Sequence, residues 1–99
     1  RRDGDAQATP PAPLPEARHS AAAAVLGGKI YLAGGVGADG AVLGTMIVYD
    51  PATNAWSTKL PMRTPRALLA LAAYQGKLWA IGGFDATQRV LTSVETYQP

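Results

Sequence analysis

Short apolar segments, separated by turn-forming residues, run along most of the chain. Three of them, at 29–33, 42–49 and 77–81, contain β-branched or aromatic residues and are bounded by Gly, Asp or Pro, which is typical of strands. Two others, at 17–26 and 67–74, are rich in Ala and Leu, with glycines close behind. Local propensity alone favours helices in these two segments. The hydrophobic pattern therefore leaves them open between helix and strand.

The chain repeats itself at an offset of 48 residues, without a gap. Of the 39 pairs that align residues 13–51 with residues 61–99, 13 are identical. They include both glycines of the doublet at 34–35 and one tyrosine of each unit, Tyr49 and Tyr97. Identity at a third of the positions, all at one offset, indicates a repeat unit of 48 residues that is present twice.

Each unit resembles a kelch repeat, which is one blade of a β-propeller. The matching features are an arginine, then a run that ends in a glycine doublet, and then aromatic or apolar residues. In the first unit these are Arg18, 28–35, 48–51 and Trp56. In the second unit they are Arg66, 76–83, Val94 and Tyr97. The resemblance covers residues 13–99. Repeats of this kind have a period of roughly 50 residues and four strands per blade.

The resemblance implies an all-β chain. It would form two four-stranded antiparallel kelch-type blades, either as an incomplete propeller or as one protomer of an assembled propeller. Inner strands converge on the propeller axis, so the alanines fit there, and packing overrides a helix preference of roughly tenths of a kcal/mol per residue. The implied strands, from the innermost outward, are 19–26, 29–33, 43–49 and 55–59 in the first unit and 67–74, 77–81 and 91–97 in the second.

The 48-residue register divides the chain into three segments. Residues 13–60 form the first blade, and residues 61–99 form the second blade without its outer strand. Residues 1–12 align with the outer strand of the first blade, so we expect them to be the outer strand of an adjacent blade. Ala8 stands where Trp56 predicts a tryptophan, which weakens that interpretation.

Composition excludes several classes of function. A hydrophobic fraction of 47% with 16% charged residues is typical of a globular chain. The net charge of +2 is too small to predict a nucleic-acid or membrane partner. Because there is no cysteine and one histidine, thiol chemistry and Cys/His metal sites are excluded and no cofactor is expected. The apolar runs are shorter than the ~20 residues of a membrane span, and the cellular compartment is left open.

Catalytic motifs are missing from the sequence. His19 and Ser20 are adjacent, and neighbours on a strand point to opposite faces, so we expect no hydrogen bond between their side chains. The serines lack a nucleophile motif, and the carboxylates lack the spacing of a metal loop. The glycine doublets also lack the residues that complete a phosphate-binding loop. Some kelch-fold oxidases bind copper through Tyr, His and Cys, a set that this chain cannot supply alone.

A loop surface is the remaining candidate site. In propellers that resemble these repeats, one mouth is lined by loops that correspond here to 36–42, 59–66 and 84–90. Arginines at the positions of Arg18 and Arg66 grip acidic peptides in some kelch proteins, which suits a planar guanidinium. The alternative is that both arginines hydrogen-bond from blade to blade. The candidate binding residues are Arg18, His19, Asp39, Arg63, Arg66, Asp85, Gln88 and Arg89.

The favoured hypothesis is a non-catalytic scaffold whose loops bind a protein or a peptide. One alternative is a fragment of a propeller-fold enzyme, sugar-modifying or copper oxidase-like, with its catalytic residues outside this chain. Another is a purely structural pair of blades. Because two blades leave faces and edges uncovered, we expect either a homo-oligomer, as a trimer or tetramer, or completion by further blades of a parent chain.

Overall fold

Both alanine-rich segments are strands, because pairing within a sheet overrides their helical propensity. The computed structural model describes residues 12–99, and within this range every regular element is a β-strand. The all-β prediction is therefore confirmed. The strands are β1 (Arg18–His19), β2 (Ala22–Leu26), β3 (Lys29–Ala33), β4 (Val36–Gly37), β5 (Met46–Asp50), β6 (Ala55–Lys59), β7 (Ala70–Tyr74), β8 (Lys77–Ile81) and β9 (Val94–Tyr97).

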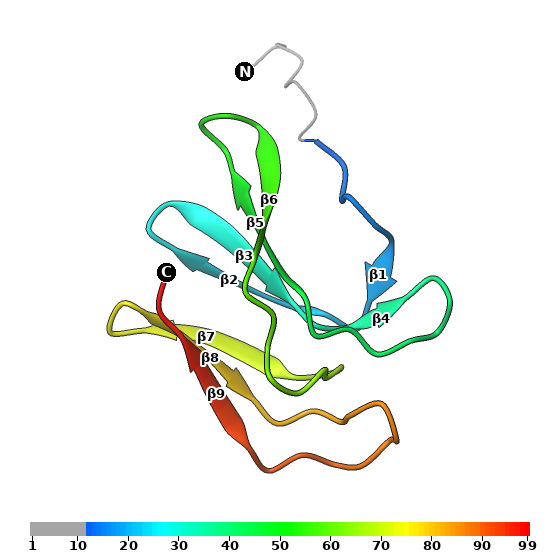
Figure 1. Cartoon of the computed structure of the whole chain (residues 1–99). Coiled ribbons are helices and arrows are strands. Elements are labelled where there is room, and N and C mark those ends of the chain that lie inside the picture. The colour runs from blue at the N-terminus through cyan, green and yellow to red at the C-terminus, as the bar shows by residue number, and fades with distance from the viewer. Residues whose placement is uncertain (1–11) are drawn as a thin grey trace, which may run out of the picture.

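The strands form two antiparallel sheets, one from each repeat (Figure 1). The first sheet has four strands in the order β2-β3-β5-β6, and the second has three in the order β7-β8-β9. A short pair, β1 with β4, lies beside the first sheet. These open sheets agree with an incomplete propeller. Of the segment 1–12, which sequence analysis assigned to an adjacent blade, residues 1–11 lie outside the described residues.

The first and third strands of each repeat begin later than predicted. The strand expected from residue 19 begins at Ala22, and the one expected from residue 67 begins at Ala70. Ser20 and Leu68 have φ values of 60° and 54°, and a residue in this left-handed region cannot continue a strand. The two deviating residues meet, since the Leu68 amide donates to the Ser20 carbonyl at 2.9 Å.

A similar correction applies to the strands expected from residues 43 and 91, which begin at Met46 and Val94. Leu43 and Leu91 donate instead to the carbonyls of Gly35 and Gly83, each at 2.8 Å. Their backbone donors are thus committed to the glycine doublets rather than to a neighbouring strand. This contact closes the base of the loop between the second and third strands of each repeat.

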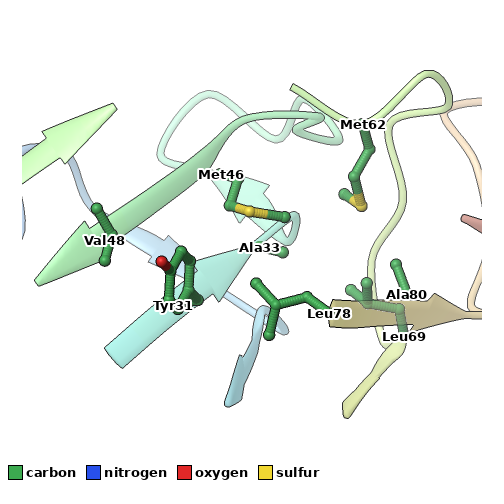
Figure 2. Close-up of a cluster of buried hydrophobic side chains, with 8 residues drawn as sticks. All are labelled: Tyr31, Ala33, Met46, Val48, Met62, Leu69, Leu78 and Ala80. Atoms are coloured by element: carbon green, nitrogen blue, oxygen red, sulfur yellow. The ribbon is translucent and has the colours of Figure 1, made fainter. Parts of the chain in front are cut away.

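The hydrophobic core lies between the two sheets. In β3 and β5, alternate side chains point toward the second sheet, as the two-residue period of a strand requires. Tyr31 lies opposite Val48 and Ala33 lies opposite Met46, and all four are buried. They pack against β8 and the connection between the sheets (Figure 2), in a cluster made of Tyr31, Ala33, Met46, Val48, Met62, Leu69, Leu78 and Ala80.

The glycine doublet after β3 lies directly against the second repeat. Gly34 and Gly35 have φ values of 69° and 98°, in the region where only glycine is unstrained. The Gly35 amide donates to the Arg66 carbonyl at 2.9 Å. A Cβ on Gly34 would overlap that same carbonyl oxygen. The missing side chains let the chain turn and let a neighbouring backbone approach.

Substitution of Gly34 by alanine tests this contact. We expect Gly34→Ala to lower the free energy of unfolding by about 3 kcal/mol or more, because overlap with the backbone of Arg66 adds to the strain of a positive φ. Gly76 is a matched control, since its φ is 74° and nothing lies within 4 Å of an added Cβ. Gly76→Ala should lower the free energy of unfolding by only ~1 kcal/mol. Urea denaturation of both variants measures the difference. Equal losses of unfolding free energy in the two variants would contradict a close contact between Gly34 and Arg66.

Candidate functional site

The loops that sequence analysis assigned to a binding mouth lie at one end of the sheets. The loop that follows β4 and the loop between β8 and β9 extend to the same side in Figure 1. The tight turns that join β2 to β3 and β7 to β8 lie at the opposite end. Each repeat therefore contributes one long loop to a shared end of the molecule.

Arg18 forms the base of this end in the first repeat. Its side chain is 1% exposed. Nη1 donates to the carbonyls of Gly34, at 3.0 Å, and Thr45, at 3.3 Å, while Nη2 donates to the Thr45 hydroxyl at 2.9 Å. Nη2 also pairs with the Glu16 carboxylate at 2.7 Å. The guanidinium thus ties the glycine doublet to the start of the third strand.

Arg66 makes the same set of contacts in the second repeat, with its side chain fully buried. Nη1 donates to the carbonyls of Gly82, at 3.1 Å, and Ser93, at 3.0 Å, while Nη2 donates to the Ser93 hydroxyl at 3.0 Å. Gly82 and Ser93 are the counterparts, at the 48-residue offset, of Gly34 and Thr45. The acid differs, because Arg66 pairs with Glu95 at 2.8 Å.

The side-chain partners of both arginines belong to the arginine's own repeat. The alternative of side-chain hydrogen bonds from blade to blade therefore does not describe their geometry. The Arg66 backbone does link the repeats, since its amide donates to the Leu43 carbonyl at 3.1 Å and its carbonyl accepts from Gly35. Whether either arginine also holds an acidic ligand stays a prediction.

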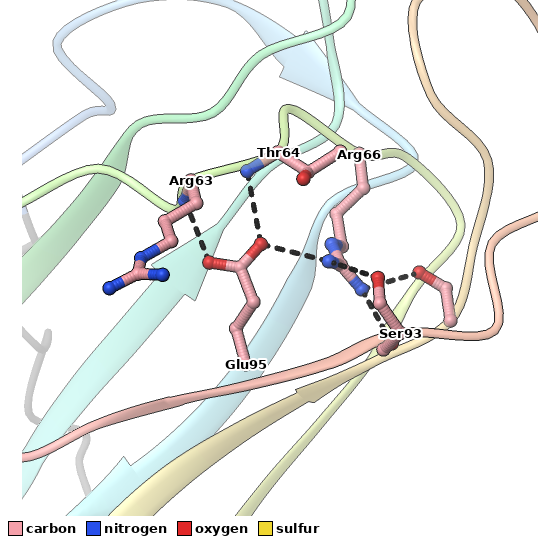
Figure 3. Close-up of polar contacts among 6 residues, drawn as sticks. Arg63, Thr64, Arg66, Ser93 and Glu95 are labelled. Carbon is pink, nitrogen blue, oxygen red and sulfur yellow. Dashed lines mark hydrogen bonds and ion pairs between the residues drawn. The ribbon is translucent and has the colours of Figure 1, made fainter.

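Glu95 joins the arginine to the connection between the sheets (Figure 3). Its Oε1 accepts from the Arg63 amide at 2.7 Å, and its Oε2 accepts from the Thr64 amide at 3.0 Å and from Arg66. Burial raises the pKa of this carboxyl, but the hydrogen bonds from Arg63, Thr64 and Arg66, together with the Arg66 charge, outweigh it and leave the pKa below its ordinary value. Glu95 is therefore held as a carboxylate.

Sequence analysis did not single out Glu95. The one available signal was a charged residue where the first repeat has the apolar Ile47. An acid at a core position of a repeat indicates a buried cationic partner. Arg66 was already a candidate residue, but the sequence did not show that Glu95 lies beside it in space.

Asp85 and Asp39 organise their own loops. Oδ1 of Asp85 accepts from the Thr87 hydroxyl, at 2.8 Å, and from the amides of Thr87, at 2.9 Å, and Arg89, at 3.0 Å. These hydrogen bonds, the Thr87 side chain first, lower the pKa of Asp85. Asp39 Oδ1 accepts from the Ala41 amide at 3.1 Å. Both carboxylates fix a turn, as aspartate side chains commonly do in loops.

The remaining candidates are exposed at three places. Gln88 and Arg89 are exposed in the same loop as Asp85. His19 is exposed on β1, where it pairs with Val36 of β4. Arg63 is exposed in the connection between the sheets. Its backbone amide, rather than its guanidinium, makes the contact with Glu95.

His19 and Ser20 correct one prediction. Their side chains are hydrogen-bonded, with Nδ1 and Oγ 2.9 Å apart. The expectation that they point to opposite faces was wrong because it assumed a continuous strand. The φ of 60° at Ser20 ends β1 and turns its side chain back toward the ring. The histidine lies on the surface.

Within residues 12–99, no group of three His, Asp or Glu side chains is placed to hold a metal ion. In the same range, no helix has the length and apolar character to cross a membrane.

The repeated arginine geometry agrees with a comparison of the sequence with known families. A family model described as the kelch motif matches residues 17–63 and again residues 65–99. The chain belongs to the kelch family. Both of its kelch repeats hold the buried arginine described above, and the family assigns the sheets to blades of a β-propeller.

Three kelch relatives illustrate the match. The chain is 40% identical over 74 residues to the influenza virus NS1A-binding protein homolog of Mus musculus, covering 75% of this chain and 11% of that protein. It is 39% identical over 88 residues to kelch repeat and BTB domain-containing protein 13 of Homo sapiens, covering 88% of this chain and 19% of that protein. An F-box/kelch-repeat protein of Arabidopsis thaliana is 40% identical over 72 residues, covering 73% and 19%. The chain thus spans less than a fifth of the length of these relatives.

Because folding lowers the pKa of Glu95, we predict that the stability of the fold depends on pH. A carboxyl whose pKa is lowered by folding stabilises the fold above its unfolded pKa, and the stabilisation is lost as pH falls through the folded value. We expect Glu95→Gln to cost about 1.5–3 kcal/mol at pH 7, because it removes hydrogen bonds to a charged group. The loss should shrink as pH falls well below 4.5, the ordinary value of this carboxyl.

The matched control for this prediction is Glu16→Gln. Glu16 pairs with the equivalent arginine, but its side chain is 53% exposed, and exposed ion pairs contribute less than about 1 kcal/mol. Urea denaturation of both variants across pH measures the difference. A Glu95→Gln loss that is independent of pH, or no larger than that of Glu16→Gln, would contradict the burial argument.

Proposed function

We propose that the chain is a non-catalytic kelch scaffold whose long loops bind a protein or a peptide. The observation that carries the proposal is the repeated arginine, which fixes the base of each loop from within while the tips stay exposed. Loops built on such a base lose little conformational freedom on binding, which favours affinity. The name of one relative describes an NS1A-binding protein, and this supports protein binding as the activity.

The candidate residues then divide into two roles. Arg18, Arg66 and Asp85 would shape the loops from inside, since Nη1 of each arginine and Oδ1 of Asp85 bind backbone atoms at the loops. Direct contacts would fall to the exposed set of His19, Asp39, Arg63, Gln88 and Arg89. Val90 adds an apolar side chain that is 84% exposed beside Arg89. A cation next to an exposed apolar residue suits an extended peptide with acidic and hydrophobic side chains.

A random peptide library selected on the immobilised chain tests this proposal. We expect selected peptides to bind saturably and to lose at least tenfold in affinity when Arg89→Ala and Val90→Ala are combined, since neither side chain supports the fold. The matched control combines Lys29→Ala with Lys77→Ala, two exposed residues at the opposite end of the sheets. Peptides whose binding ignores the loop change, or is lost in the control, would contradict a loop surface.

We further propose that other blades cover the free faces of this pair. Val25 of the first sheet is 63% exposed, and Tyr74 and Val94 of the second are 62% and 49% exposed. These side chains point away from the shared core. Repeat units depend on neighbours to bury such faces. The neighbours would come from further copies of this chain, as a trimer or tetramer, or from blades of a longer chain.

Light scattering on the isolated 99-residue chain tests this coverage. Ring closure by copies predicts a particle of three or four times 10.3 kDa. A requirement for parent blades predicts aggregation or an unfolded chain instead. A monodisperse 10.3 kDa particle with well-dispersed NMR signals would contradict both forms, because it would show that two blades are stable with their faces exposed.

A further inference from the structure

The long loops of the two repeats have the same backbone hydrogen bonds. In the first loop, the Gly37 amide donates to the Ala41 carbonyl at 2.9 Å, and the Gly40 amide donates to the Gly37 carbonyl at 3.0 Å. Their counterparts at the 48-residue offset make the same two hydrogen bonds, at 3.0 and 2.9 Å. Gly40 and its counterpart Gln88 both have positive φ, at 84° and 65°. One loop therefore shows which kinds of side chain the equivalent positions of the other can hold.

The two loops satisfy one equivalent amide with acids at different positions. In the first repeat, the Ala41 amide donates to Oδ1 of Asp39 at 3.1 Å. In the second repeat, the equivalent Arg89 amide donates to Oδ1 of Asp85 at 3.0 Å. The counterpart of Asp39 in that loop is Thr87, whose hydroxyl donates to the same Asp85 oxygen at 2.8 Å. By this equivalence, the second loop can hold an anionic group at position 87, where the sequence has a hydroxyl.

The Thr87 side chain is accessible to an enzyme that modifies hydroxyl groups. Thr87 is exposed, and so are the other residues of 86–90. Arg89 follows two positions later and is exposed as well. A cation close to the acceptor hydroxyl suits a kinase whose substrate groove is acidic, because complementary charges favour the encounter.

We propose that Thr87 is a phosphorylation site and that its phosphate replaces Asp85 as the acceptor of the Arg89 amide. A kinase supplies the γ-phosphoryl group of a nucleoside triphosphate. The Thr87 oxygen forms a bond to phosphorus, the bond to the departing nucleoside diphosphate breaks, and the hydroxyl proton passes to the kinase. Phosphothreonine carries about −1.5 to −2 charges at pH 7 and has several acceptor oxygens. It therefore takes the role that Asp39 has in the first loop.

Phosphorylation turns an attraction between Thr87 and Asp85 into a repulsion. The ester oxygen of phosphothreonine has no proton to donate, so Asp85 loses the hydrogen bond that contributes most to lowering its pKa. The phosphate and the carboxylate also repel each other as like charges. The Arg89 charge, which acts on Asp85 in the unmodified loop, is attracted to the phosphate. Arg89 therefore turns from Asp85 to residue 87, while the backbone hydrogen bonds of the loop are kept.

Variants without a phosphate test the equivalence of the two loops. Asp85→Ala removes the acceptor of the Arg89 amide, so we expect amide hydrogen exchange at Arg89 to become at least fivefold faster. Combining Asp85→Ala with Thr87→Asp places a carboxylate at the position of Asp39 and should restore slow exchange. The matched control combines Asp85→Ala with Thr87→Val, which has the shape of threonine without an acceptor. Failure of the aspartate to restore slow exchange, or equal rescue by valine, would overturn the proposal.

A kinase assay on the full chain tests the acceptor. The kinase is one that phosphorylates a synthetic peptide of residues 83–91, supplied with ATP. Thr64 is the matched control, because it also precedes an arginine by two residues, but it is half-buried and its amide is bound to Glu95. We expect mass spectrometry to find phosphate on Thr87 at a rate within threefold of that in the peptide, and at least tenfold less on Thr64. Absence of phosphate on Thr87, or equal modification of both threonines, would overturn the proposal.

The phosphorylated chain reports the change of partner directly. We expect exchange at Arg89 to stay slow after phosphorylation even in the Asp85→Ala variant. In ³¹P NMR, Arg89→Ala should raise the second pKa of the phosphate by about 0.3–0.5, because a nearby cation favours the more charged form. Arg63→Ala, which removes an exposed cation outside this loop, should leave that pKa unchanged. Fast exchange at Arg89, or a phosphate pKa that ignores Arg89, would overturn the proposal. Neither measurement uses a peptide ligand, so its failure would leave the proposed loop binding untouched.

Discussion

Arg66 is the residue on which the joining of the two repeats depends. Its backbone belongs to the first repeat's network, since its amide and carbonyl bind Leu43 and Gly35. Its side chain belongs to the second repeat, where it binds Gly82, Ser93 and Glu95. One fully buried residue thus fixes where the second sheet begins relative to the loops of the first. A guanidinium suits this task because its planar fork holds several acceptors at once.

This link explains why glycines follow the second strand of each repeat, where two backbones come into close contact. The backbone of Arg66 reaches the first repeat only because Gly34 has no side chain in its path. Within each repeat, the second glycine of the doublet has a similar contact, because a Cβ on Gly35 or Gly83 would overlap the carbonyl of His19 or Ala67. The doublets are therefore contact points between backbones rather than flexible hinges. The amides of Gly34, Gly35 and Gly82 already donate to the carbonyls of Thr45, Arg66 and Ser93, so these three donors are not free to bind a phosphate.

The 48-residue repeat predicted the secondary structure better than local propensity did. The alanines at 21–24 favour a helix when read alone, but the 48-residue offset aligns them with 69–72 and assigns both to inner strands. Strand starts were missed because Ser20 and Leu68 adopt positive φ, and neither residue type predicts that conformation. The hydrogen bond between His19 and Ser20 was missed for the same reason, since the two side chains meet where the strand is broken.

The candidate site was predicted in part. The arginines and loops followed from the family resemblance, but their partners depend on three-dimensional register, which a single sequence does not display. Glu95 was missed because its partners are two backbone amides and an arginine 29 residues away. Asp85 was predicted as a candidate binding residue, and its role in fixing the turn emerged only from the positions of Thr87 and Arg89.

The two repeats satisfy the same buried arginine with acids from different elements. In the second repeat the acid comes from a strand, because Arg63 and Thr64 each offer an amide to Glu95. In the first repeat the counterpart of Arg63 is Pro15, which has no N–H to donate. A carboxylate at the strand position there would be left partly unsatisfied, and Ile47 occupies it instead. Glu16, from the connecting segment, supplies the charge. The fold therefore pairs the guanidinium at the base of each loop with a carboxylate, and the segment that provides the acid differs between the repeats.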